Sequence, residues 1–120
     1  MQREMLQGKI HNAVVTSCQV EYAGSLEVDI ELIERAGLLV HQKIQLLDIT
    51  NGQRLETYLI PGERGKRQVD VKGAAARLIN PGDRVIIIGY AFLTDEEIAT
   101  CKPTVLVMDG KNEVLEELHP

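Results

Sequence analysis

The chain has 120 residues, of which 44% are hydrophobic and 26% charged, so its composition is that of one ordinary domain and not of a disordered segment. With 13 Lys and Arg against 18 Asp and Glu, the net charge of −5 argues against a general binder of nucleic acid or of anionic membranes. No apolar run approaches the roughly 20 residues of a membrane span, and the polar, acid-containing N-terminus is unlike a signal peptide, so we expect a cytoplasmic location.

The first third of the chain predicts two strands and a short helix. A strand is expected over Met5–Val20, and Tyr22–Ser25 then has the composition of a turn. A second, alternating strand follows over Leu26–Ile30. Asp29 can cap a short helix over Glu31–Ala36, because its side chain can accept a hydrogen bond from the first helical N–H groups.

The middle of the chain predicts a β-hairpin. The strands Ile44–Ile49 and Leu55–Ile60 flank Thr50–Gln53, in which Asn-Gly suits a turn that needs positive φ. A loop over Pro61–Arg67 and a short strand over Val69–Val71 follow.

The remaining residues predict a helical turn over Gly73–Leu78, a turn over Asn80–Asp83 and an apolar strand buried on both faces over Val85–Ile88. A short helix over Asp95–Thr100, with Thr94 or Asp95 as its cap, a last strand over Thr104–Met108 and a flexible acidic tail over residues 109–120 follow. Six to eight short strands without a long amphipathic helix favour a mainly β barrel or compact sandwich, because these architectures leave few open strand edges, which would invite aggregation. Since only 3% of the residues are aromatic, we expect an aliphatic core. No linker or repeat interrupts the chain, so we predict a single domain over residues 1–120.

Taken one at a time, the polar residues indicate no particular chemistry. The sequence has no P-loop, no GxSxG motif and no HExxH motif. Cys18 and Cys101 are far apart and the three histidines are scattered, so we expect two reduced packing thiols and no metal site. Alone, Gly24-Ser25 is a turn dipeptide, and Lys9 and Arg54 are solvated cations.

Six short strings are informative only as an ordered set: Met5–His11, Tyr22–Ser25, Asn51–Tyr58, Gly62–Gly65, Gly73–Arg77 and Pro81–Asp83. In this order they resemble the aspartate 1-decarboxylase family, the pyruvoyl-dependent bacterial enzymes that make β-alanine for pantothenate and coenzyme A. The resemblance runs from about Met5 to Tyr90 and is loose after Phe92.

The resemblance implies a double-psi β-barrel with a few short helices, assembled as a homotetramer with active sites between subunits. It also implies a proenzyme that cuts itself between Gly24 and Ser25 into a β chain, 1–24, and an α chain, 25–120. The Ser25 hydroxyl attacks the Gly24 carbonyl to form an ester, and elimination then frees the Gly24 carboxylate. Hydrolysis of the remaining dehydroalanine releases ammonia and leaves the pyruvoyl group. Nothing in the sequence indicates a maturation helper.

The implied reaction is decarboxylation of L-aspartate at its α-carboxylate to β-alanine and CO2. The pyruvoyl ketone forms a Schiff base with the substrate amine and accepts electrons as CO2 leaves. By resemblance, Tyr58 donates a proton to the carbanion, and Arg54 and Lys9 hold the substrate carboxylates. Thr57 matches a family position that is tied to both processing and substrate binding. The resemblance also implies that the backbone of Gly73, Ala74 and Ala75 lines the substrate site. It implies that His11 and Tyr22 support the cleavage site.

Two positions depart from the family pattern. Lys72 stands where the family usually has Asn, and Leu47 stands where many members have an aromatic residue. An Asn side chain both donates and accepts hydrogen bonds, whereas Lys only donates and adds charge, so Lys72 bears on processing or on substrate geometry.

Two alternatives remain at this point. One is a non-catalytic barrel that binds a partner or small ligand and never matures, with Lys72 as the reason. The other is pyruvoyl chemistry on a different amino acid, although Arg54 and Lys9 argue against an apolar substrate side chain.

Overall fold

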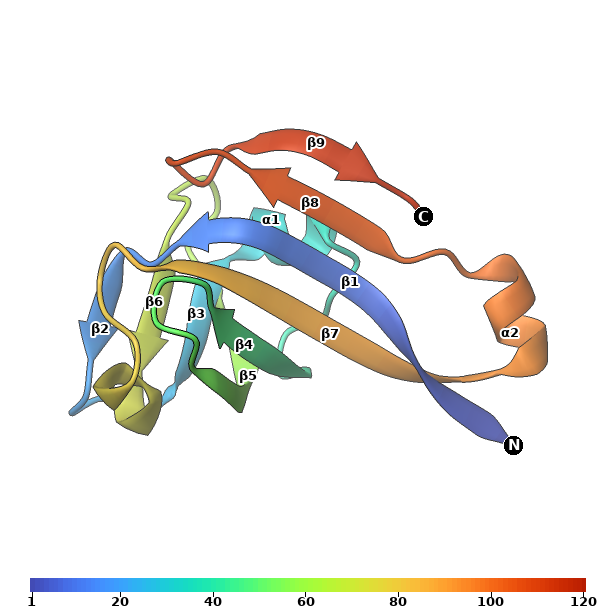
Figure 1. Cartoon of the computed structure of the whole chain (residues 1–120), viewed down its shortest axis with the longest axis horizontal. Coiled ribbons are helices and arrows are strands. Elements are labelled where there is room, and N and C mark those ends of the chain that lie inside the picture. Colours follow the sequence, from blue (N-terminus) through green and yellow to red (C-terminus); the bar gives the residue numbers. More distant parts are fainter.

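The computed structural model describes all 120 residues, Met1 to Pro120, as a mainly β fold (Figure 1). The nine strands are β1 (Gln2–Val14), β2 (Ser17–Gln19), β3 (Ser25–Asp29), β4 (Lys43–Asp48), β5 (Arg54–Gly62), β6 (Val69–Lys72), β7 (Arg84–Thr94), β8 (Thr104–Met108) and β9 (Val114–Leu118). The helices are α1 (Ile30–Arg35), the 3-10 turn η1 (Gly73–Arg77) and α2 (Asp95–Thr100). None of them has the length and apolar character to cross a membrane.

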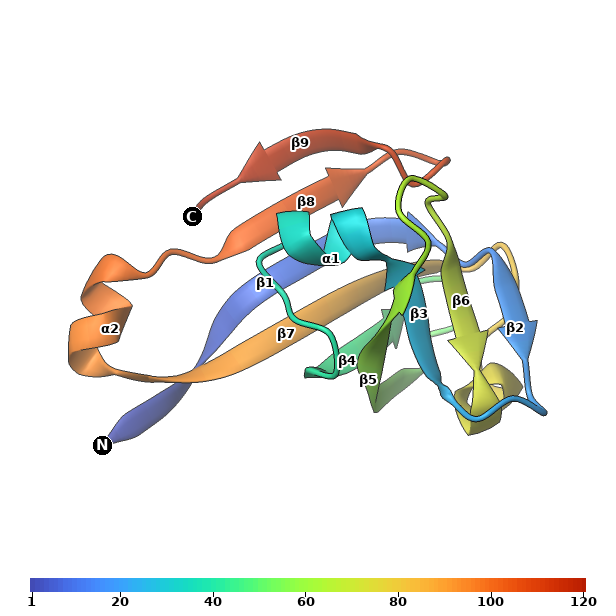
Figure 2. The same cartoon turned by 180° about the vertical axis from the view of Figure 1, so that it is seen from behind.

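The strands are hydrogen-bonded in the order β2-β6-β3-β5-β4-β7-β1-β8-β9, with parallel and antiparallel pairs mixed. The sheet curls around one core, and a two-stranded extension that ends in α2 projects from it (Figures 1 and 2). We call this extension, residues 1–7 and 90–102, the arm, and the rest of the chain the body. The predicted mainly β, barrel-like class with a few short helices is confirmed, and the double-psi topology stays a prediction.

The core is one cluster of 19 buried hydrophobic side chains, none of which is aromatic. Leu26 on β3, Leu46 on β4 and Ile87 on β7 are each 0% exposed. Burying a side chain of this size stabilises the fold by about 1.5–3 kcal/mol. The predicted aliphatic core is therefore confirmed, and it lies directly behind β3, the strand that begins at Ser25.

The two short helices begin at the predicted caps. The Asp29 side chain accepts a hydrogen bond from the Glu31 backbone N–H at the start of α1. Thr94 and Glu97 form a reciprocal capping box at the start of α2. These local signals lie within a few residues of one another, so the sequence alone predicts them.

Two predicted boundaries are wrong because of contacts from distant segments. The first strand is split into β1 and β2, since the backbone N–H groups of Val15 and Thr16 bond to the carbonyls of Asp83 and Val69. Strand β5 continues through Pro61-Gly62, which the sequence indicated as loop, because both residues pair with β3.

The second half of the chain differs from the prediction in three ways. The strand predicted over Val85–Ile88 extends over Arg84–Thr94, and only one of its faces is fully buried: Val85 and Ile87 lie in the core, whereas Ile86 and Ile88 are partly buried. Part of the tail that the sequence indicated as flexible forms β9, which pairs with β8. Cys18 packs against the core as predicted, but Cys101 is exposed.

Candidate active site

The Gly24–Ser25 peptide lies where an exposed turn enters the buried strand β3. Gly24 is exposed, whereas the Ser25 side chain is 3% exposed and its hydroxyl has no hydrogen-bond partner. A buried hydroxyl without a partner costs free energy, which most proteins avoid by pairing the group. The structure therefore holds an unpaired nucleophile directly after the Gly24 carbonyl.

The backbone at Gly24 is pressed against the backbone at Gly73. A Cβ atom on Gly24 would lie 2.7 Å from the Lys72 carbonyl oxygen, and one on Gly73 would lie 2.6 Å from the Gly24 Cα. Gly73 also has a φ of +82°, a conformation that residues with a Cβ rarely adopt. Both glycines are thus required by space, and the turn and β6 hold each other in place.

Tyr58 on β5 reaches the same peptide. Its phenol donates a hydrogen bond of 3.2 Å to the Gly24 carbonyl oxygen. A donor at this oxygen draws electron density from the carbonyl carbon and so favours attack on it. The ring of His41 packs edge-on against Tyr58, with the ring centroids 6.4 Å apart. Thr57, the preceding residue, faces the other side of the strand, because successive side chains alternate.

The predicted cations and His11 lie on the outer face of the sheet formed by β5, β4, β7 and β1. Ile10 is 1% exposed and points into the core, so Lys9 and His11 on either side of it point outward. Cross-strand pairing places Arg54 in one row with His11, through Leu47 and Ile86. Leu47 therefore lies between two predicted site residues.

Arg54 and Tyr58 share this outer face but are separated along it. Four residues of strand correspond to about 13 Å between their Cα atoms, which is more than an aspartate molecule spans. Within one chain, Tyr58 therefore reaches the Gly24–Ser25 peptide, whereas the Cα atom of Arg54 lies further along β5, away from it.

The turn before Arg54 is shaped by a buried carboxyl. Asp48 is 3% exposed, and its Oδ1 accepts hydrogen bonds from the backbone N–H groups of Thr50 and Asn51. Burial and the adjacent Asp83 carboxyl raise the pKa of Asp48 above its usual range. Asp48 therefore takes up a proton at a higher pH than an exposed aspartate does, and its other oxygen, Oδ2, has no hydrogen-bond partner.

The sequence left open that Lys72 adds a free cation to the substrate region, but in the structure the Lys72 ammonium is already engaged by other side chains. This ammonium lies 3.3 Å from a carboxylate oxygen of Glu27 and 5.3 Å from the centroid of the Tyr22 ring. Of the predicted Gly73–Ala75 backbone, Gly73 is buried against Gly24 and Ala74 is exposed. The structure thus brings Tyr22, Gly24, Ser25, Tyr58 and the segment from Lys72 together, and it leaves Lys9, His11 and Arg54 elsewhere on the body.

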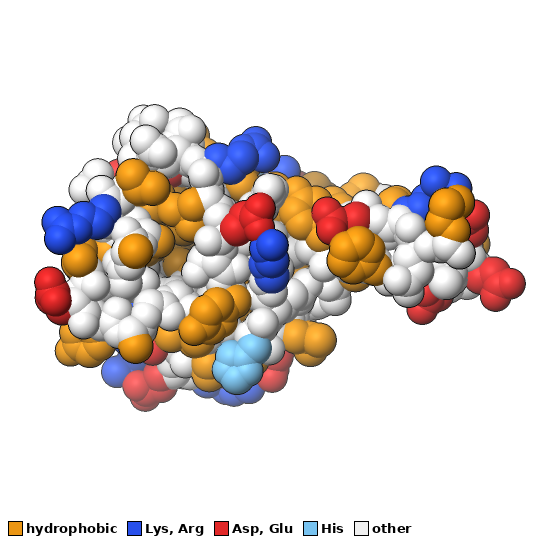
Figure 3. Space-filling model, turned by 90° about the horizontal axis from the view of Figure 1, so that it is seen from below, with side chains coloured by type: hydrophobic (Ala, Val, Ile, Leu, Met, Phe, Trp, Pro, Cys, Tyr) orange, Lys and Arg blue, Asp and Glu red, His pale blue; other side chains and the backbone are white.

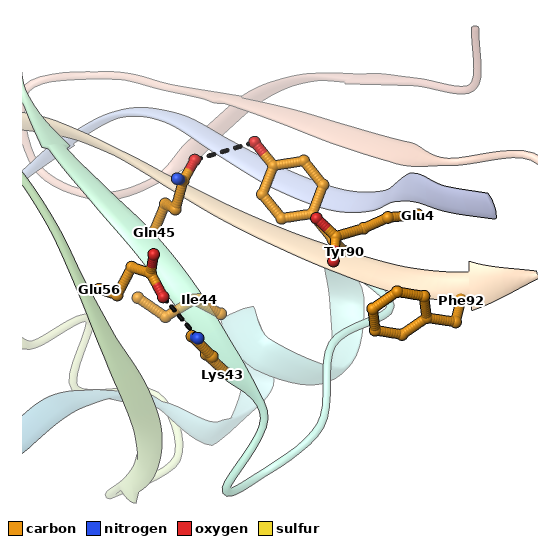
Figure 4. Close-up of a pocket in the computed structure, with 7 residues that line it drawn as sticks. All are labelled: Glu4, Lys43, Ile44, Gln45, Glu56, Tyr90 and Phe92. Carbon is orange, nitrogen blue, oxygen red and sulfur yellow. Dashed lines mark hydrogen bonds and ion pairs between the residues drawn. The ribbon is translucent and has the colours of Figure 1, made fainter.

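The structure has a pocket that the sequence did not indicate. It has a volume of about 260 Å³ and opens on the outer face of the sheet, lined by Glu4, Lys43, Ile44, Gln45, Glu56, Tyr90 and Phe92 (Figure 4). In Figure 4 the Tyr90 hydroxyl donates to Gln45, and Lys43 pairs with Glu56. The continued alternation of apolar residues past Ile88 was the one sequence signal for the Tyr90 and Phe92 side of this pocket.

Large apolar side chains are exposed near the pocket and the site. Leu39 is 67% exposed, Phe92 64% and Tyr58 45%. Seen from below, hydrophobic side chains lie between charged ones over the body and along the arm (Figure 3). Large apolar side chains are therefore exposed on the body and on the arm.

Residues 1–115 match the family described as aspartate decarboxylase. A protein of Wolinella succinogenes named aspartate 1-decarboxylase is 46% identical over 99% of this chain and 98% of its own length. Proteins of the same name from Clostridium beijerinckii and Bacillus subtilis are 49% and 45% identical, over 93% and 95% of this chain and 90% of each relative. The resemblance predicted from the sequence is confirmed, and it extends through the segment after Phe92.

Proposed function

The chain belongs to the aspartate decarboxylase family, and on this premise we propose that it decarboxylates L-aspartate at the α-carboxylate, giving β-alanine and CO2. We place the reaction in the cytoplasm, where β-alanine serves pantothenate and coenzyme A biosynthesis. Relatives that carry the activity in their names align with nearly the whole of this chain, which supports the assignment.

The proposal includes a pyruvoyl group made from Ser25 by cleavage of the chain after Gly24. The observation that carries it is the buried, unpartnered Ser25 hydroxyl beside a carbonyl that already accepts a hydrogen bond from Tyr58. The hydroxyl adds to the Gly24 carbonyl, the C–N bond breaks and an ester forms. Elimination releases the Gly24 carboxylate, and water then replaces the nitrogen of the dehydroalanine, which leaves as ammonia.

The residues present fit such a group. Its ketone would take up the substrate amine and accept the electrons released with CO2. The Tyr58 hydroxyl, which already lies at the Gly24 carbonyl, would be next to the new terminus and could return a proton to the substrate carbon. Arg54 and Lys9 would bind the two carboxylates of aspartate, Arg54 through its planar pair of N–H donors.

We further propose a homotetramer in which neighbouring subunits complete each active site. Within one chain Arg54 and Tyr58 are about 13 Å apart along β5, so one small substrate is better served by residues of two chains. Thr57 faces away from Tyr58 and would contribute from the opposite side of its strand. The exposed Leu39 and Phe92 supply apolar surface for such contacts.

The direct test is β-alanine formation from L-aspartate by the purified protein. We expect activity from the parent chain and none from a Ser25→Ala variant, which keeps the fold but lacks the hydroxyl. A Tyr58→Phe variant should lose roughly 10²–10⁴-fold in kcat, the usual contribution of a positioned acid. A cleaved parent chain that releases no CO2 from L-aspartate, but turns over another amino acid, would show that the substrate assignment is wrong.

A further inference from the structure

Lys72 occupies the position opposite Ser25 in the β3–β6 pair. The two residues are direct partners in the antiparallel ladder, so their side chains lie on the same face. Glu27, two residues further along β3, points to that face as well, and its carboxylate lies 3.3 Å from the Lys72 ammonium. Both side chains are about four-fifths buried, at 19% and 23% exposure, so solvent screens this ion pair less than it screens a surface pair.

The other contact of Lys72 is on the opposite side of the scissile bond. Its ammonium lies 5.3 Å from the centroid of the Tyr22 ring, within the range of a cation–π interaction. Tyr22 precedes Gly24 by two residues, and Glu27 follows Ser25 by two. One side chain therefore connects the segment that becomes the end of the short fragment with the strand that begins the long fragment.

We propose that Glu27, Lys72 and Tyr22 form a clamp that positions the Gly24–Ser25 bond for self-cleavage, an inference that rests on the cleavage proposed above. Glu27 is a positioning residue, since it acts through Lys72 and touches neither reacting atom. Lys72, which stands where the family usually has Asn, thus has Glu27 as its ion-pair partner.

The geometry explains how the clamp acts on the bond. A Cβ placed on Gly24 would lie 2.7 Å from the Lys72 carbonyl oxygen and 3.0 Å from the Gly73 Cα, which is closer than van der Waals contact allows. A shift of Lys72 would therefore move the backbone atoms that Gly24 packs against. Displacements of about 1 Å at a reacting pair can cost a hundredfold in rate, so loss of the clamp should be measurable.

The test is the first-order rate at which freshly purified full-length chain converts to two fragments, followed by denaturing mass spectrometry. We expect Glu27→Gln and Lys72→Met each to slow this conversion by roughly ten- to hundredfold. The double variant should be no slower than the slower single variant, because both changes remove the same interaction. Lys72→Arg, which can keep both contacts, should cleave within about threefold of the parent rate.

The matched control is Lys66→Met, which removes an exposed lysine paired with Glu63 at 2.9 Å, away from the cleavage site. It should leave the cleavage rate unchanged. Each substitution is also placed in a Ser25→Ala chain, which cannot cleave, and its urea midpoint is measured, so that a general loss of stability is recognised.

The outcomes separate the two proposals. A parent chain that never cleaves overturns the proposed function and this inference with it. If the parent cleaves and the clamp variants cleave equally fast, only the clamp is overturned. Strictly additive rate losses in the double variant, or slow cleavage in Lys72→Arg, would also contradict it.

Discussion

The arm and one end of the body are held together in opposite ways; we call that end, around Gly24 and Gly73, the cleavage end. At Gly24 the backbone packs directly against the backbone at Gly73, and the following residues, Ser25 and Leu26, are buried. The arm is the far part of the β1–β7 ladder with α2 at its tip, and its Phe92 is 64% exposed. A surface ion pair between Arg3 and Asp95 adds a contact between β1 and the first residue of α2.

This difference separates what one chain needs for its own chemistry from what it offers to others. The proposed cleavage of the Gly24–Ser25 bond would require a rigid geometry, and the close backbone contact between Gly24 and Gly73 supplies one within a single chain. Exposed apolar surface on the arm has no such role within one chain, and a neighbouring subunit would give it one.

The strongest test of this contrast compares Leu26→Ala with Phe92→Ala, both in the uncleavable Ser25→Ala chain. Leu26 is 0% exposed, so its truncation should lower the free energy of unfolding by about 2–5 kcal/mol. Phe92→Ala should cost less than about 0.5 kcal/mol at concentrations where the chain is monomeric. Urea unfolding measures both values, and equal losses would mean that the arm is as tightly packed as the cleavage end.

The same contrast can be sharpened at two glycines. Gly73 and Gly52 have similar φ angles of +82° and +80°, but a Cβ on Gly52 would meet no atom within 4 Å. Both changes to Ala incur the cost of positive φ, whereas only Gly73→Ala forces the turn away from β6. We expect Gly73→Ala to destabilise the fold by about 1–3 kcal/mol more than Gly52→Ala, and to slow cleavage. Equal effects on urea unfolding would show that the close approach to Gly24 is unimportant.

Two aspartates buried in the body show how burial can affect stability in opposite ways. Burial alone would raise the pKa of Asp29, but hydrogen bonds from the backbone of Arg67, Glu31 and Gly65 and from the Arg67 guanidinium lower it. The stability that Asp29 contributes is therefore present above the unfolded-state pKa and lost as pH falls through the folded-state pKa. The pH dependence of the contribution from Asp48 has the opposite sign, because burial and Asp83 raise the pKa of Asp48.

For Asp48, the stabilising contribution is present at acid pH and is lost as pH rises through the raised pKa. An Asp48→Asn variant keeps the acceptor for the N–H groups of Thr50 and Asn51 and adds a donor toward Asp83. We expect it to raise the free energy of unfolding near pH 7 by about 1 kcal/mol, the net value of one hydrogen bond. Urea unfolding between about pH 4 and pH 8 in the Ser25→Ala chain measures this. A variant whose stability follows the same pH dependence as the parent would contradict this account.

Features with local causes could be predicted from the sequence, and features with distant causes could not. The caps at Asp29 and Thr94 and the turn at Asn51-Gly52 depend on a few neighbouring residues. The break after β1 depends on hydrogen bonds to Asp83 and Val69, and the acidic strand β9 forms because β8 is there to pair with it.

The same distinction applies to the site. Its residue types could be identified from an ordered set of strings, but the Tyr58–Gly24 hydrogen bond joins residues 34 positions apart and requires the parallel pairing of β3 with β5. The Glu27–Lys72 pair likewise depends on the register between β3 and β6. No periodicity within one strand reveals either contact.

The most direct test of the central claim is a denaturing intact-mass spectrum of the purified chain before and after a warm incubation. We expect two fragments, one of residues 1–24 that ends in the Gly24 carboxylate and one of residues 25–120 that begins with a pyruvoyl group in place of Ser25. The second fragment should be lighter than its serine-containing counterpart by the mass of the lost ammonia. A chain that stays at full-length mass throughout, or that is cut without this loss, would contradict the account.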